Sequence, residues 1–292
     1  GCFGILLTAW KSGRFNLKKD KMKKYPKLLI IAGSDSGGGA GIQADIKSAG
    51  ACGAYSSTVI TALTAQNTLG VKAIEGVSPQ MIAAQMEAVL EDIGADAIKI
   101  GMLHSKEVIE VIASQLKAYK CQNIVLDPVM VATSGDRLLQ EEAMQALMET
   151  MIPLADVITP NIPEMELLLG QSLTKATAFS DYAKALADKF KVSVLLKAGH
   201  LQGKTSVDIL FNYKTQQITE LSSPRVDTKN THGTGCSLSS ALGSYLAQGF
   251  SLEEAAKKAK TFIYQALKAG RDYTLGKGSG PVHHFFKSDE VN

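Results

Sequence analysis

A polar segment at Thr228–Cys236 is the stretch of this sequence best suited to chemistry. It carries several hydroxyl and amide side chains, and Gly233 and Gly235 allow backbone shapes that side chains would block. The small and apolar residues that follow predict a helix from Ser237 to about Gln248. The first N–H groups of a helix lack backbone partners, and the helix dipole is positive at that end. We therefore expect an anion, most readily a phosphate, over Gly233–Cys236. An ordinary helix cap is the alternative that this stretch alone leaves open.

A second group of glycines and polar residues stands where predicted strands end. Short apolar runs alternate with helix-forming segments, which predicts a mostly parallel sheet covered by helices on both faces. In such a sheet, ligands bind beyond the carboxyl ends of the strands. We therefore expect the following residues to converge on one site with the glycine segment: Gly33, Ser34, Asp35, Gly101, Met102, Asp127, Asn161, Glu164 and Lys197.

Three charged residues in this group suit a phosphate and its metal ion. Asp127 and Glu164 offer the carboxylate oxygens that Mg²⁺ prefers, and Lys197 can meet a phosphate as a point charge. Each also has an ordinary structural explanation. Asp127 precedes Pro128 and could be a turn residue, Glu164 favours a first helical turn, and Lys197 could be solvated. Their convergence at strand ends is what favours an anion and metal site.

Hydrophobic periodicity predicts the elements that position these residues. Predicted strands cover 27–32, 97–100, 123–126, 157–158 and 193–196, and predicted helices cover 42–51, 79–93, 105–120, 141–151, 162–169, 180–190 and 252–270. Two β-rich pairs, 55–62 with 71–77 and 207–213 with 217–221, predict a small flap and a hairpin. We expect one domain over 25–292 with the flap near 55–78, and a leader or N-terminal extension over 1–24.

Composition excludes several classes of function. A net charge of +3 with dispersed Lys and Arg argues against a nucleic-acid face and against a membrane-binding field. The apolar run over residues 2–10 is too short to span a bilayer. The four cysteines are isolated from one another and form no C-x-x-C motif, which favours a reducing, cytoplasmic location over a disulfide framework or a zinc site.

Two nucleotide-binding motifs can be set aside. The segment Gly39–Ala44 fits G-x-G-x-x-A, but residues 55–65 contain no Asp or Glu to bind a ribose. The segment Gly199–Thr205 is one residue short of a P-loop and precedes a β-rich run where a P-loop requires a helix. A dinucleotide oxidoreductase is therefore disfavoured.

Seven segments together resemble the hydroxymethylpyrimidine/phosphomethylpyrimidine kinases of thiamine biosynthesis. They are 31–45 (IAGSDSGGGAGIQAD), 61–68 (TALTAQNT), 99–103 (KIGML), 126–130 (LDPVM), 159–164 (TPNIPE), 230–236 (NTHGTGC) and 276–285 (GKGSGPVHHF). The likeness runs in order from about Lys27 to Phe286, without large gaps, and leaves 1–24 outside. It implies an α/β fold of the ribokinase superfamily: a three-layer α/β/α sandwich with a mostly parallel sheet and a small β flap, usually a homodimer.

The resemblance implies an ATP-dependent enzyme that phosphorylates 4-amino-5-hydroxymethyl-2-methylpyrimidine, and its monophosphate to the diphosphate. Carried over by matched position, the pyrimidine is expected at Gly33, Asp45, Gln66, Met102 and Val129. The Gln66 amide has the donors and the acceptor that an aminopyrimidine edge requires. Asp45 could accept from the exocyclic amine, or it could be a charge on a helix surface.

ATP and Mg²⁺ are expected, on the same resemblance, at the other end of the site. The matched residues are Asn161, Glu164, Lys197, Thr228 and Thr231, with Asp127 and Glu164 on the metal side. Lys277, in a glycine-rich loop, is a further candidate for nucleotide contact. The adjacent residues His283 and His284 do not share a face of a regular strand or helix, so we interpret them as structural.

Cys236, with Gly233, Thr234 and Gly235, forms the expected catalytic group. Most ribokinase relatives carry Asp at the position of Cys236, where it serves as the base for the acceptor hydroxyl. A thiol at a helix N-terminus can have its pKa lowered towards neutrality. The hypothesis is that Cys236 assists deprotonation of the hydroxyl or orients it. The alternative is a small residue that packs under the loop.

Two other functions remain as alternatives. A pyridoxal kinase of the same subfamily also phosphorylates a hydroxymethyl group on a heteroaromatic ring, and some members add a lid cysteine. The matching segment here, 131–136, has no Cys, which favours the pyrimidine. A non-catalytic ligand-binding relative would be expected to have lost metal and phosphate groups, yet Asp127, Glu164 and the glycine segment are present.

Overall fold

The computed structural model describes residues 23–130, 138–139, 141–173, 179–199 and 203–291. Most of the predicted leader over 1–24 and the whole of segment 131–136 lie outside the described residues. Within them, no helix is long and apolar enough to cross a bilayer.

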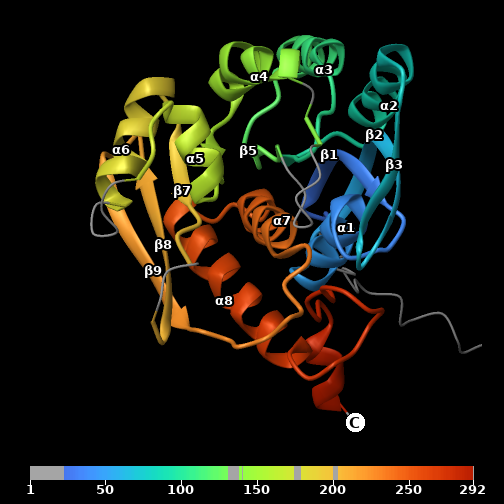
Figure 1. The fold of residues 1–292 in the computed structure, drawn as a ribbon. Helices are drawn as coiled ribbons and strands as arrows, with labels where there is room; N and C mark the ends of the chain where they lie inside the picture. The colour runs from blue at the N-terminus through green and yellow to red at the C-terminus, as the bar shows by residue number, and fades with distance from the viewer. Residues whose placement is uncertain (1–22, 131–137, 140, 174–178, 200–202, 292) are drawn as a thin grey trace, which may run out of the picture.

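A nine-stranded sheet runs through the molecule in the order β3-β2-β1-β4-β5-β6-β7-β8-β9 (Figure 1). Its strands are β1 (Lys27–Asp35), β2 (Tyr55–Asn67), β3 (Gly70–Gly76), β4 (Ala97–Ile100), β5 (Ile124–Leu126), β6 (Val157–Ile158), β7 (Ser193–Leu196), β8 (Thr205–Asn212) and β9 (Gln217–Pro224). The six strands from β2 to β7 in this order pair in parallel, whereas β3, β8 and β9 add antiparallel pairings at the two edges. The predicted mostly parallel α/β fold is therefore confirmed.

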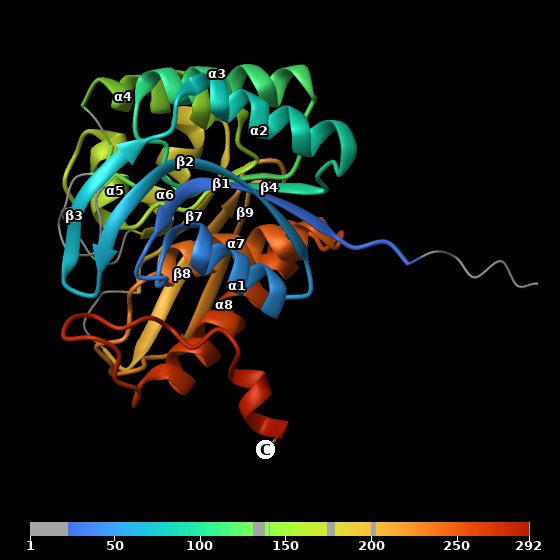
Figure 2. The ribbon, with the colours of Figure 1, turned by 90° about the vertical axis from the view of Figure 1, so that its right-hand side faces the viewer.

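Helices cover both faces of the sheet, as Figure 2 shows from the side. One layer holds α2 (Pro79–Asp92), α3 (Lys106–Ala118), α4 (Glu141–Ala146), α5 (Ile162–Leu169) and α6 (Phe179–Phe190); the other holds α1 (Gly41–Ala51), α7 (Thr234–Ala247) and α8 (Leu252–Gly270). Alternate residues of β1 enter the two cores: Leu29 and Ile31 face the first layer, and Leu28 and Ile30 face the second. The central strands are apolar on both sides because both sides are buried.

Among the element boundaries that differ from the sequence prediction, two lie at the site. Helix α7 begins at Thr234 instead of Ser237, because its N-cap Gly233 has a φ of 79° and turns the chain directly into the helix. Strand β2 continues through Asn67, where a connecting segment from Thr64 was expected. Leu63 and Thr64 pair with β1 on one side and with β3 on the other, and residues 65–67 pair with β3, so backbone groups find partners there. As a result, Gln66 stands on a paired strand.

Several short helical segments complete the fold, and the capping residues of α5 set its two ends. Helix α5 has the predicted bounds, since the side chain of Asn161 accepts from Glu164 N, Glu164 reaches back to Asn161 N, and Gly170 ends the helix with a φ of 73°. The segment after α4 continues as a π-helical turn, Leu147–Met151, and a 3₁₀ turn, Ile152–Leu154. A final 3₁₀ segment, Phe286–Val291, ends the described chain.

Candidate active site

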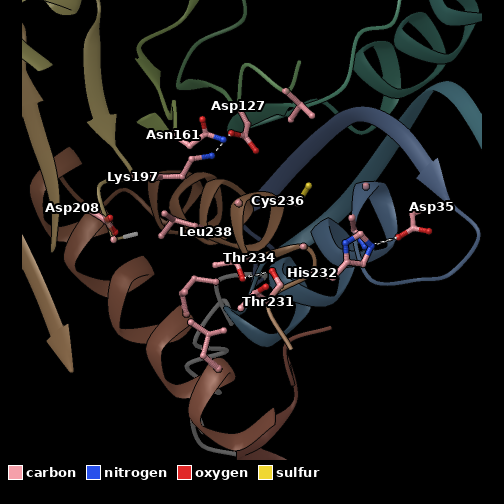
Figure 3. A pocket seen from close by; sticks show the side chains of 18 of the residues that line it. Asp35, Asp127, Asn161, Lys197, Asp208, Thr231, His232, Thr234, Cys236 and Leu238 are labelled. Carbon is pink, nitrogen blue, oxygen red and sulfur yellow. Dashed lines mark hydrogen bonds and ion pairs between the residues drawn. The ribbon is translucent and has the colours of Figure 1, made fainter. Parts of the chain in front are cut away.

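A cavity of about 800 Å³ opens at the carboxyl ends of the parallel strands. Most of the residues predicted for the site line it: Gly33, Gln66, Met102, Asp127, Val129, Asn161, Glu164, Lys197, Thr228, Thr231, Gly233, Thr234, Gly235 and Cys236. Figure 3 shows Asp127, Asn161 and Lys197 on one side of Cys236, and Thr231 and Thr234 on the other. The cavity is continuous between the groups expected to hold the acceptor and those expected to hold the phosphate donor.

The glycine segment forms a tight turn into α7. A Cβ on Gly233 would lie 1.8 Å from the carbonyl oxygen of Gly39, so there is no room for a side chain here. The positive φ of Gly233 also favours glycine. The Thr234 N–H and hydroxyl both bond to the Thr231 carbonyl oxygen. The next amides, of Gly235 and Cys236, are in the first helical turn, where helix geometry supplies no backbone acceptor. They are therefore suited to an anion.

Lys197 joins this turn to two carboxylates. Its Nζ lies 2.8 Å from Asp127 Oδ1 and 4.0 Å from Glu164 Oε2. Asp127 Oδ1 also accepts from Thr159 Oγ1 at 3.0 Å. A Cβ on Gly235 would lie 3.1 Å from Lys197 Nζ, so the backbone of the turn faces the ammonium group directly. The Lys197 ammonium group is thus shared by the turn at residues 233–236, called the phosphate turn below, and by the carboxylates of Asp127 and Glu164.

Burial and charge set the protonation of this cluster. Burial alone would raise the pKa of Asp127, but Lys197 and Lys99 outweigh it and the pKa is lowered. Burial opposes the charge of Lys197 too, yet Asp127 and Glu164 raise its pKa. Burial, together with the Asp127 charge, raises the pKa of Glu164 to about 7 despite Lys197. Asp127 and Lys197 are therefore ionised at neutral pH, whereas Glu164 is close to its midpoint.

Cys236 lies at the centre of the cavity with a partly exposed side chain. Desolvation raises the pKa of its thiol to about 11, although Lys99 acts in the opposite direction. The expected lowering of this pKa towards neutrality is therefore wrong. The helix N-terminus does favour a thiolate, but desolvation and the nearby carboxylates of Asp45 and Asp127 prevail.

Asp45 is placed differently from the expectation. It is fully buried in α1, and it is not among the residues that line the cavity. Both of its carboxylate oxygens lie 2.8 Å from Lys99 Nζ, and Oδ1 also accepts from Ser240 Oγ at 2.7 Å. Neither direct pyrimidine contact nor a helix-surface charge describes this residue. Lys99, which does line the cavity, separates Asp45 from it. A lysine inside the otherwise apolar Ala97–Ile100 strand was a signal that an acidic partner must exist.

Lys277 lies apart from the other candidate residues, and its contact with the nucleotide stays a prediction. Its side chain is exposed and does not line the cavity, and its backbone N–H donates to Thr68 Oγ1 at 3.2 Å. The glycine-rich loop that carries Lys277 packs against the turn between β2 and β3, as Figure 2 shows. His284 is buried next to Ser237 of α7, and burial lowers its pKa to about 4, so it is a neutral partner there.

Comparison with known proteins decides the family. Residues 35–283 match the family described as phosphomethylpyrimidine kinase. A hydroxymethylpyrimidine/phosphomethylpyrimidine kinase from Rhizobium meliloti (strain 1021) is 46% identical over 260 residues, which cover 89% of this chain and 97% of that protein. The chain belongs to the phosphomethylpyrimidine kinase family. The family expected from the sequence segments is thus confirmed.

Solved structures of family members and their neighbours share the fold. The crystal structure of phosphomethylpyrimidine kinase from Clostridium difficile 630 is 43% identical, covers 84% of this chain and all of its own, and gives a TM-score of 0.73. An ADP complex of Bacillus subtilis pyridoxal kinase is 35% identical, covers 92% of this chain and all of its own, and gives a TM-score of 0.81. The ribokinase-like sandwich expected for this family member is therefore present.

Two pairs of residues in the cavity were not predicted as contacts from the sequence, although Asp35 was expected at the site. At one end, Lys260 of α8 donates to Asp208 Oδ2 at 2.7 Å and to Ser206 Oγ at 3.0 Å, and all three line the cavity. At the other end, His232 Nε2 lies 3.0 Å from Asp35 Oδ2. Periodicity could not reveal either pair, because the partners are far apart in the chain. Charged or imidazole side chains in otherwise small or apolar segments are the signal that could have found them.

Proposed function

We propose that this protein uses ATP to phosphorylate 4-amino-5-hydroxymethyl-2-methylpyrimidine, and then its monophosphate to the diphosphate, in thiamine biosynthesis. The observation that carries the proposal is the shared cavity. The phosphate turn of α7 and the Lys197 cluster meet, at Cys236, the groups expected to hold the pyrimidine. Membership of the family supplies the substrate class. Phosphoryl transfer depends mainly on positioning and on charge neutralisation, and this arrangement offers both.

The acceptor end is proposed to bind the pyrimidine through Gln66, Gly33, Met102 and Val129. Gln66 Oε1 lies 3.1 Å from Thr64 Oγ1, which orients the amide on the paired strand β2. A Cβ on Gly33 would come within 2.9 Å of Met102 Sδ, so glycine leaves room for the thioether beside the ring site. Asp45 is not carried into this proposal as a direct contact, since its carboxylate is engaged by Lys99.

Cys236 is proposed to orient the acceptor hydroxyl for transfer. With the pKa of its thiol raised to about 11, the group is protonated at neutral pH and serves as a hydrogen-bond partner. The amides of Gly235 and Cys236, together with Lys197, would stabilise charge on the transferring phosphoryl group. One preorganised donor of this type lowers the activation free energy by about 3 kcal/mol.

The nucleotide is proposed to reach from the phosphate turn past Asn161, Thr228 and Thr231. The residues present also fit a bound Mg²⁺, because Mg²⁺ typically uses one or two carboxylates together with substrate phosphates. Asp127 and Glu164 both have a carboxylate oxygen within 4.0 Å of Lys197 Nζ and would supply those carboxylates. When bound, the ion would supply further charge neutralisation to the phosphates. An ion there would favour the charged form of Glu164. Its binding is testable by titrating ATP with and without Mg²⁺ by calorimetry.

One assay tests the function: ADP release from ATP with the pyrimidine alcohol, its monophosphate, pyridoxal, or no acceptor. We expect ADP release that depends on each pyrimidine acceptor, and loss of it when EDTA removes the metal ion. ADP release that neither pyrimidine stimulates would exclude the proposed reaction.

A pyridoxal kinase activity is the second candidate. It is favoured by one observation, the TM-score of 0.81 to the Bacillus subtilis pyridoxal kinase. Against it stands the absence of cysteine in the 131–136 sequence. A comparison of kcat/KM for the pyrimidine alcohol and for pyridoxal separates the two, and a higher value for pyridoxal would reverse the assignment.

A cytoplasmic homodimer is proposed as the form in which the protein acts. Cys52, Cys121 and Cys236 are free thiols in the part of the chain that the structure describes, which suits a reducing compartment. The dimer follows the resemblance to the ribokinase superfamily. Light scattering on the full chain should give twice the mass of one chain, and the mass of a single chain would contradict the dimer.

A further inference from the structure

We propose that His232 is a positioning residue for phosphoryl transfer, which Asp35 holds so that the acceptor loop stays in register with the phosphate turn. The acceptor loop is residues 33–41, which run from the end of β1 through the turn after it to the first residue of α1, and the phosphate turn is residues 233–236. This inference rests on the proposed kinase function and adds a residue to it. His232 and Asp35 both line the cavity, and Figure 3 shows the contact between them.

Asp35 is the point where the acceptor loop is tied together. It ends strand β1 and is almost fully buried, with 3% of its surface exposed. Its Oδ1 accepts from Gly37 N at 2.8 Å, and its Oδ2 accepts from Gly39 N at 3.1 Å and Ala40 N at 2.8 Å. Its Oδ2 also lies 3.0 Å from His232 Nε2. One carboxylate therefore organises the whole loop and joins it to a second segment.

His232 brings the phosphate turn to that point. Its ring covers Gly39 so closely that a Cβ there would lie 2.3 Å from His232 Cδ2. The neighbouring Gly233 touches the same part of the loop, since a Cβ on it would lie 1.8 Å from Gly39 O. The two glycines allow the backbones to approach, and the imidazole–carboxylate contact fixes how they sit against each other.

The backbone of His232 is anchored independently of its ring. Its N–H donates to Gly280 O at 3.0 Å. Next to it, Asn230 Nδ2 donates to Gly270 O and to Tyr273 O, both at 2.7 Å. Loss of the imidazole should therefore leave this segment folded while its alignment with the acceptor loop relaxes. A positioning role can thus be separated from a role in folding.

The consequence for the reaction is geometric. The two ends of the acceptor loop, residues 33–35 and 40–41, line the cavity and include Gly33 of the proposed pyrimidine site, while the phosphate turn lines it where the transferring phosphate is proposed. In-line transfer needs the hydroxyl and the phosphoryl group at a near-attack distance, and a misplacement of about 1 Å can lower the rate about 100-fold. We therefore assign to the His232–Asp35 pair the alignment of acceptor with donor.

The test compares His232→Ala, His232→Gln and the matched control His283→Ala in the full chain. We expect kcat of His232→Ala to fall about 30- to 100-fold with either pyrimidine acceptor, while the KM for ATP changes less than about 3-fold. Gln can donate from its Nε2 to Asp35, so His232→Gln should recover most of kcat. His283 has its ring against Tyr273 outside the cavity, so His283→Ala should keep the wild-type kcat.

Thermal unfolding of the same variants completes the test. His232→Ala and His232→Gln should melt within a few degrees of each other, so that a difference in kcat reports alignment. A wild-type kcat in His232→Ala would overturn the proposal. So would a kcat as low in His232→Gln as in His232→Ala when both are folded. Should the wild-type chain itself release no ADP with either pyrimidine, the proposed function would fail instead.

Discussion

The Lys197 ammonium lies 2.8 Å from the Asp127 carboxylate, where strands β5 and β7 end on the same edge of the sheet. The side chain of Lys197 is 16% exposed and that of Asp127 is 2% exposed, so the pair is largely desolvated. In such a pair, removal of one partner leaves a buried charge without compensation. The same lysine faces the phosphate turn, so its loss should affect stability and catalysis together.

Lys197→Met should lower kcat/KM for ATP about 100-fold or more and reduce the free energy of unfolding by about 3 kcal/mol. Urea denaturation and steady-state kinetics measure the two effects. Lys214→Met is the control, because Lys214 pairs with Asp156 with its side chain 80% exposed and should cost less than about 1 kcal/mol. Equal effects of the two substitutions would contradict the role given to Lys197.

Cys236→Ala should cut turnover strongly while ATP binding stays largely intact, because the thiol is placed at the acceptor. Cys236→Ser, which keeps a hydrogen-bonding group, should retain more activity. Since desolvation raises the pKa of this thiol to about 11, alkylation by iodoacetamide at pH 7.5 should be at least about 10-fold slower than that of a free thiol. Rapid alkylation at neutral pH would restore the hypothesis of a Cys236 thiolate base, and unchanged turnover of Cys236→Ala would remove the residue from the mechanism.

Glu164 should make stability depend on pH in the apo protein. Burial raises its pKa in the folded state to about 7 from the usual 4.5. The folded state then binds a proton more tightly than the unfolded state, so the free energy of unfolding should fall as pH rises from 4.5 to 7. Above pH 7 the charged Glu164 carboxylate lowers the free energy of unfolding by up to about 3 kcal/mol relative to its value at pH 4.5.

Glu164→Gln removes that charge and can still accept from Asn161 N. We expect it to raise the free energy of unfolding at pH 8 and to have little effect at pH 4.5, as measured by urea denaturation. Glu149→Gln, the same substitution at an exposed position of the π-helical turn, provides the control. A stabilisation by Glu164→Gln that does not change with pH would show that the pKa of Glu164 is not raised.

Asp45 and Lys99 should behave as a structural pair. Lys99→Met leaves the fully buried Asp45 carboxylate without its cation and should destabilise the fold by about 3–5 kcal/mol. Asp45→Asn should likewise reduce stability, but in the folded fraction the KM for the pyrimidine should change less than about 3-fold. An increase of KM well beyond this, with stability unchanged, would return Asp45 to direct substrate binding.

The loop that carries Lys277 should hold the turn between β2 and β3 through its glycines. A Cβ on Gly278 would lie 1.9 Å from Thr68 O, so Gly278→Ala should push the loop away and raise the KM for the pyrimidine several-fold. Gly50→Ala is the matched control. A Cβ on Gly50 of α1 meets nothing within 4 Å, and alanine in the helix should stabilise by about 0.5–1 kcal/mol. Normal kinetics in Gly278→Ala would contradict the coupling of this loop to the flap.

Local sequence determined much of the scaffold. Helix α5 begins and ends where Asn161 and Gly170 predict, and α8 covers the predicted 252–270, because capping and amphipathic periodicity act within one or two turns. The strand-end rule brought Asp127, Lys197 and the phosphate turn to one cavity, since parallel strands place their carboxyl ends on one edge.

Tertiary structure alone decided the partners and the charge states. Asp45 pairs with Lys99, which is 54 positions away in the chain, and Asp35 pairs with His232, which is 197 positions away. No local sequence pattern encodes such contacts. The thiol of Cys236 stands at the helix N-terminus that its sequence position implies. Its raised pKa depends on how much protein surrounds it and on which charges lie nearby. Desolvation is a property of the packed molecule, which is why the sequence predicted where Cys236 stands but not its protonation.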